Sequence, residues 1–201
     1  SVAANAVFDL GMPGTILQRA GVPNLPLRLR RGVFRRKAKK HSELTEAALL
    51  ALPDALQNPM AVFVSPGDRK AHGIVTVLQT PEGPVTAYFT VREMNGESVL
   101  EAKTVFGKDV QRLLAELHQA ESQQLLTHVN KAAFDGWLAQ GDGASKGNTS
   151  AQHGQAIEGL SDFFAQFDTE SKPRVQPSTA NTKPLRATRK AVTDALKVLA
   201  D

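Results

Sequence analysis

The residues most suited to chemistry are Lys40 and His41, at the end of a strongly basic stretch. Between positions 28 and 40 there is no acid, and the cations are Arg28, Arg30, Arg31, Arg35, Arg36, Lys37, Lys39 and Lys40. A histidine titrates near neutral pH unaided, so beside these cations it suits acid–base chemistry on a phosphate. His41 is therefore a candidate catalytic acid or base, and Lys40 is a second catalytic candidate that would steady the phosphate. Arg35 and Arg36 are candidates to bind the substrate. The alternative is that His41 only helps to cap the helix that follows.

A second group of candidates is the sequence Lys103–Lys108, at the end of a predicted strand. In metal-free RNA cleavage a base takes the 2′-hydroxyl proton and an acid protonates the leaving 5′-oxygen, while cations or hydroxyls stabilise the charge on phosphorus. Thr104 suits catalysis in this scheme, and Lys103 and Lys108 suit substrate binding. In the predicted strand Thr104 shares a side with Leu100, Ala102 and Phe106, so a packed β-branched residue is the alternative.

The composition excludes several classes of function. The chain has no cysteine, which excludes disulfides, thiolate nucleophiles and cysteine-based metal sites. Its five histidines show neither His-x-x-x-His spacing nor a tight cluster with carboxylates, so we expect no metal and no cofactor. The chain also lacks the nucleophile-elbow and phosphate-loop glycine motifs.

The basic stretch also predicts a polyanionic partner, although a solvated charged arm is an equal alternative. No apolar run approaches the roughly 18 residues of a membrane span, so we expect a soluble chain with no membrane partner. The sequence begins with Ser1 rather than Met, which suggests a segment of something longer. The compartment stays open, with a bacterial cytoplasm as the working hypothesis.

The elements that position these candidates follow from turn residues and periodicity. Residues 1–27 are punctuated by glycine and proline, which predicts an irregular lead-in with a short helix near 15–20. Thr45 is a candidate N-cap for a helix that Asn58-Pro59 closes. Four strands then follow, at about 60–65, 74–79, 85–92 and 98–106.

The strand at 85–92 alternates apolar and polar residues, which is typical of a sheet covered on one side. Asn95-Gly96 predicts a tight hairpin turn. We further predict a helix from Asp109, a return strand at 125–129 and a helix capped by Asn130. A glycine-rich linker then leads to a tail with short amphipathic helices. The predicted organisation is a lead-in at 1–27, an α+β domain at 28–140 and a flexible tail at 141–201.

This order of elements resembles a known superfamily. The motifs that carry the resemblance are Lys-Lys-His before the first helix, Leu-Pro and Asn-Pro within and after that helix, and Lys-Thr-Val-Phe-Gly-Lys at the end of the fourth strand. The chain is similar to the phage-associated nuclease-like domains of the barnase, EndoU, colicin and RelE superfamily, including the C-terminal domains of phage head-morphogenesis polyproteins. The resemblance covers about residues 13–140. It implies an RNase-like fold, in which a basic arm and a helix precede a four-stranded antiparallel sheet with covering helices. By position it carries over His41, Thr104, Lys40 and Lys108, with Phe106 where a tyrosine is expected.

Charge placement and resemblance together give the hypothesis of a metal-independent endoribonuclease of the toxin or phage-effector type. Its partners are then RNA, for instance tRNA, and an immunity or antitoxin protein. The alternative is a non-catalytic module of a phage or mobile-element polyprotein that binds nucleic acid or protein. Convergence of His41 and Thr104 on one phosphate-sized site would favour the nuclease.

Overall fold

The computed structural model describes residues 7–30, 32–33, 45–141 and 151–167. The elements in this part are β1 (Val7–Gly11), α1 (Thr15–Arg19), β2 (Leu27–Arg30), α3 (Glu46–Ala55), β3 (Ala61–Ser65), β4 (Asp68–Thr80), β5 (Gly83–Met94), β6 (Glu97–Gly107), α4 (Val110–Ser122), β7 (Leu126–Val129), α5 (Lys131–Gly141) and α6 (Ala151–Ala165). The α+β class is therefore confirmed.

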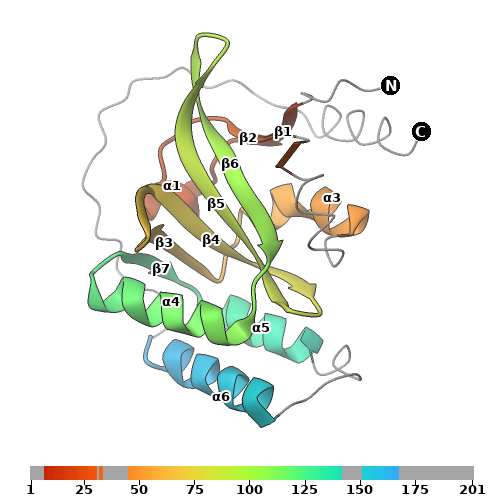
Figure 1. Cartoon of the computed structure of the whole chain (residues 1–201), viewed down its shortest axis with the longest axis vertical. Coiled ribbons are helices and arrows are strands. Elements are labelled where there is room, and N and C mark those ends of the chain that lie inside the picture. Colours follow the sequence, from red (N-terminus) through yellow and green to blue (C-terminus); the bar gives the residue numbers. More distant parts are fainter. Residues whose placement is uncertain (1–6, 31, 34–44, 142–150, 168–201) are drawn as a thin grey trace.

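The strands form one seven-stranded sheet in the order β1-β2-β6-β5-β4-β3-β7 (Figure 1). Strands β3 to β6 are the four predicted strands, and each pairs antiparallel with the next. The predicted limit of four strands is wrong, because β7 adds to β3 at one end and β2 adds to β6 at the other. The β2–β6 pair is parallel, and β1 completes that end by pairing antiparallel with β2.

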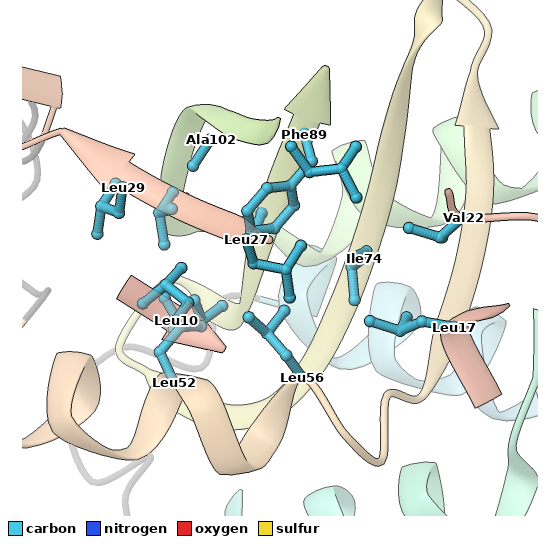
Figure 2. Close-up of a cluster of buried hydrophobic side chains, with 14 of the residues drawn as sticks. Leu10, Leu17, Val22, Leu27, Leu29, Leu52, Leu56, Ile74, Phe89 and Ala102 are labelled. Carbon is cyan, nitrogen blue, oxygen red and sulfur yellow. The ribbon is translucent and has the colours of Figure 1, made fainter. Parts of the chain in front are cut away.

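Helices α1 and α3 cover one face of the sheet, here called the α3 face. The side chains of Leu52 and Leu56 project from α3 toward Leu27, Ile74 and Phe89 of the sheet (Figure 2). All five side chains are fully buried. Apolar burial of this extent is the main stabilising term for such a layer, about 2 kcal/mol for each large side chain.

Helices α4, α5 and α6 cover the other face, here called the α4 face, over strands β3, β4, β5 and β7 (Figure 1). The prediction of a sheet covered on one side is therefore wrong. The polar-looking positions Thr86, Tyr88 and Thr90 of β5 are all less than 10% exposed, although they alternate with apolar residues. Threonine and tyrosine carry enough apolar surface to be buried under a helix, so alternation alone did not identify an exposed face.

Residues 7–27, expected as an irregular lead-in, contain β1 and α1 and contribute buried residues such as Phe8, Leu10 and Leu17 to the α3 face. The short helix predicted near 15–20 is confirmed as α1. In the tail, α6 packs on α4 and α5, with Leu160 and Phe163 fully or almost fully buried. Within the described residues no helix is long and apolar enough to cross a membrane.

Three helices begin where the sequence predicts, and a polar side chain caps the start of each. The Thr45 hydroxyl accepts a hydrogen bond from the Ala48 amide at 3.2 Å, and the carboxylate of Asp109 accepts one from the Arg112 amide at 3.0 Å. The Asn130 side chain caps α5 in the same way. Each side chain satisfies an amide that has no partner within its own helix.

Candidate functional site

A β-bulge in β6 decides where Thr104 points. Tyr88 of β5 pairs with Thr104, but the next residue, Phe89, pairs with Ala102, so Lys103 is the extra residue of the bulge. Directly paired residues point to the same side of a sheet, so Thr104 lies on the α4 face with Tyr88. The predicted side of Thr104 is therefore wrong: Ala102 packs on the α3 face and Thr104 does not.

The same bulge brings Thr104 next to Glu101. Glu101 pairs with Thr90, which lies two residues from Tyr88 and thus on the same face. Neighbouring positions on one face of a strand are about 7 Å apart, so the carboxylate of Glu101 and the hydroxyl of Thr104 have neighbouring attachment points. Among the described residues the buried hydroxyl oxygens of Thr104 and Thr90 have no hydrogen-bond partner.

Two arginines of β2 extend this group across the sheet. Leu27 and Leu29 of β2 are buried on the α3 face, so Arg28 and Arg30 project to the α4 face. Arg30 Nε lies 2.5 Å from Glu101 Oε1, and Arg28 forms an ion pair with Asp9 of β1. We call Asp9, Arg28, Arg30, Glu101 and Thr104 the β2–β6 cluster.

The strands that carry the β2–β6 cluster contribute few side chains to the core of the α4 face. Among the described residues its buried members come from β3, β4, β5, β7 and the helices, with Phe106 of β6 packed partly against them. The Arg28 and Arg30 side chains are 23% and 48% exposed, respectively. The cluster is thus a half-buried polar region beside the three covering helices.

Lys108, predicted to bind substrate, contacts other side chains of the protein. Its ammonium group donates hydrogen bonds to the Tyr88 hydroxyl and to Glu116 of α4, and the Tyr88 hydroxyl donates to Glu116 at 2.6 Å. Burial, and then the nearby Glu116 carboxylate, raise the pKa of Tyr88 well above its ordinary value. This network joins α4 to the sheet, and Phe106 stacks on the Tyr88 ring at 6.1 Å.

Lys103 and His72 also differ from simple solvent-exposed residues. Lys103 Nζ lies 2.6 Å from Asp68 Oδ2, and this hydrogen bond holds the pKa of that carboxyl below its ordinary value. His72 belongs to β4, and burial lowers its pKa. Its Nδ1 is buried without a hydrogen-bond partner among the described residues.

The other candidates, Arg35, Arg36, Lys40 and His41, lie outside the described residues. The helix that follows them is described, and α3 packs on the α3 face. Thr104 lies on the opposite face. The convergence of His41 with Thr104 therefore stays a prediction.

Sequence reasoning missed the roles of Arg28, Arg30 and Glu101 in one cluster. The alternation of Leu27 and Leu29 with the arginines is visible in the sequence. No local pattern showed that this segment pairs with β6, more than 70 residues later.

A search of curated proteins gave no match, and neither did a search of solved structures. A comparison with protein families matched residues 34–135 to the phage MuF C-terminal domain. This range contains α3, strands β3 to β7, α4 and the first part of α5, and leaves β1, α1, β2 and α6 outside. It makes up half of the 201 residues, and the chain therefore belongs to the phage MuF C-terminal domain family.

Proposed function

We propose that this phage domain is a metal-independent endoribonuclease of the toxin or effector type, with its site at the β2–β6 cluster. The observation that carries the proposal is the bulge at Lys103, which turns Thr104 onto the face of Glu101. Bulges often re-aim a side chain beside an active site. Here the bulge gives a hydroxyl and a carboxylate neighbouring positions, next to the two arginines of β2.

The reaction assigned to this site is transesterification of RNA. Glu101 takes the 2′-hydroxyl proton, the 2′-oxygen attacks phosphorus, and the bond from phosphorus to the 5′-oxygen breaks. His41 donates the proton that the leaving 5′-oxygen needs, which leaves a 2′,3′-cyclic phosphate and a 5′-hydroxyl. The Thr104 hydroxyl and nearby cations such as Lys40 stabilise the charge on the phosphorane oxygens.

Chain connectivity limits where His41 can act. It lies four residues before Thr45, and four extended residues span at most about 14 Å. Because α3 packs on the α3 face, His41 reaches the β2–β6 cluster only if the chain between Val33 and Thr45 passes an edge of the sheet.

The full chain tests the proposal when it is incubated with tRNA in EDTA. We expect cleavage products that end in a cyclic phosphate. Glu101→Gln and His41→Ala should each lower the rate by at least about 100-fold, because each removes a proton-transfer group. Lys131→Gln is a matched control, since Lys131 lies on α5 and forms an ion pair with Asp135 of the same helix. An inactive wild-type protein contradicts the nuclease, whereas full activity in both variants contradicts the assignment of Glu101 and His41 as its proton-transfer groups.

The second candidate is a binding module without catalysis, and two observations favour it. The helix after His41 packs on the face opposite Thr104. In addition, the side chains of Arg28, Arg30, Lys103 and Lys108 each form an ion pair with a carboxylate. RNA binding without any cleavage would support this candidate. An immunity protein that holds the domain inert is compatible with the first candidate, the endoribonuclease.

A further inference from the structure

The segment before the family-matched range supplies two arginines to the α4 face. Arg28 and Arg30 lie two residues apart on β2, so their attachment points are about 7 Å apart on one face. Neither belongs to residues 34–135. Any role they have therefore lies outside the matched range.

The backbone that carries them is firmly held. Strand β2 pairs with β1 along its whole length and with β6 at Leu27 and Arg28. Leu27 and Leu29, which alternate with the arginines, are 0% and 3% exposed. Apolar anchors on one face therefore fix the position of the arginines on the other.

The carboxylates orient the guanidinium groups without using all their donors. Arg30 donates a hydrogen bond from Nη2 to Glu101 at 3.5 Å, and its Nε lies 2.5 Å from the same carboxylate. Arg28 Nη1 forms an ion pair with Asp9. A guanidinium has five N–H donors in a planar fork, so each arginine keeps N–H groups for a further acceptor. Phosphate is an acceptor whose geometry matches such a fork.

We propose that Arg28 and Arg30 form a binding site for the phosphodiester backbone of RNA, beside Glu101 and Thr104. This inference rests on RNA as the ligand of the proposed function. Asp9 positions the guanidinium group of Arg28, and Glu101, the proposed base, also orients that of Arg30. The segment that carries β1 and β2 therefore supplies substrate affinity, while the family-matched range supplies the reacting groups.

The test measures binding of a fluorescent 12-nucleotide RNA to the full chain, with His41→Ala as background in all proteins to prevent cleavage. Arg28→Gln combined with Arg30→Gln should weaken binding by about tenfold or more, because charged hydrogen bonds are lost. The slope of log affinity against log salt should fall by about 1.4, as expected for two lost phosphate contacts on a single strand. Arg19→Gln on α1, at the opposite face, is the matched control and should change neither quantity.

A second measurement does not require the double variant, and it tests the inference even if that variant does not fold. In the His41→Ala chain, the side-chain Nε–H signals of Arg28 and Arg30 should shift on titration with the RNA, and that of Arg19 should not. Unshifted signals overturn the inference, as does a folded double variant with unchanged affinity. The inference is also overturned if polyglutamate binding, but not RNA binding, depends on the arginines, since the site would then fit an acidic protein.

These outcomes are separable from those of the nuclease test. Arginine-dependent RNA binding by a chain that does not cleave RNA supports this inference and contradicts the proposed function. Cleavage by the wild-type chain together with RNA binding that does not depend on the arginines supports the proposed function and contradicts this inference.

Discussion

Thr104, predicted as a catalytic residue, lies on the α4 face, and its buried hydroxyl has no hydrogen-bond partner among the described residues. Thr104→Val keeps the shape and removes the hydroxyl. We expect its free energy of unfolding to stay within about 1 kcal/mol of wild type, since no hydrogen bond is lost. RNA cleavage should fall by about 100-fold if the hydroxyl stabilises the phosphorane.

Thr86 provides the control for this substitution. It is a fully buried threonine of the same face whose hydroxyl also has no partner in the described part of the chain, and it pairs with Phe106, outside the β2–β6 cluster. Thr86→Val should leave both stability and cleavage close to wild type. Equal activity in the two valine variants would exclude Thr104 from the reaction.

His72 makes stability depend on pH. Burial lowers its pKa in the folded state below the ordinary value of 6.5, so the unfolded chain takes up this proton first. Its contribution to stability is complete above about pH 6.5 and is lost as the pH falls through 6.5 toward the lower folded pKa. Urea unfolding between pH 7 and 5 should show this loss.

Replacing the histidine isolates its contribution. His72→Gln should flatten the decline in unfolding free energy between pH 7 and 5, although His128, whose pKa burial also lowers, still contributes. The matched control is His118→Gln, since the His118 side chain is 53% exposed. An unchanged slope in His72→Gln would show that this imidazole is not buried in solution.

At the scale of elements, α6 is held by aromatic packing. The Phe164 ring stacks on that of Phe134 at 4.2 Å, and Phe164 is 1% exposed. Phe164→Ala should lower the free energy of unfolding by about 3–5 kcal/mol, because it leaves a large cavity. Phe167→Ala should cost clearly less, since Phe167 is only partly buried. Similar small losses in both variants, measured by urea unfolding, would show that α6 is not docked.

At the scale of the whole molecule, the core extends beyond the predicted boundaries of 28 and 140. A fragment of residues 28–140 lacks buried residues of β1 and α1, such as Leu10 and Leu17, and Leu160 and Phe163 of α6. We expect this fragment to lose the cooperative urea transition, followed by circular dichroism, while residues 7–167 retain it. A cooperative transition with an unchanged midpoint in the short fragment would restore the predicted boundaries.

The sequence by itself determined the features that depend on near neighbours. Thr45 and Asn130 were identifiable as caps, and Asp109 as a helix start, because each satisfies an amide three residues away. The hairpin at Asn95-Gly96 was identifiable because both residues tolerate the positive φ that they adopt, 53° and 81°. Periodicity located β3 to β6 for the same local reason.

Only the tertiary structure decided the features that join distant segments. The pairing of β2 with β6 links residues 27 and 28 to residues 100 and 101, and no local pattern specifies that partner. The bulge at Lys103 is an extra residue relative to β5, so it exists only in the paired strands. The basic stretch was visible from the start, but strand pairing decided that Arg28 and Arg30 lie beside Glu101 and Thr104.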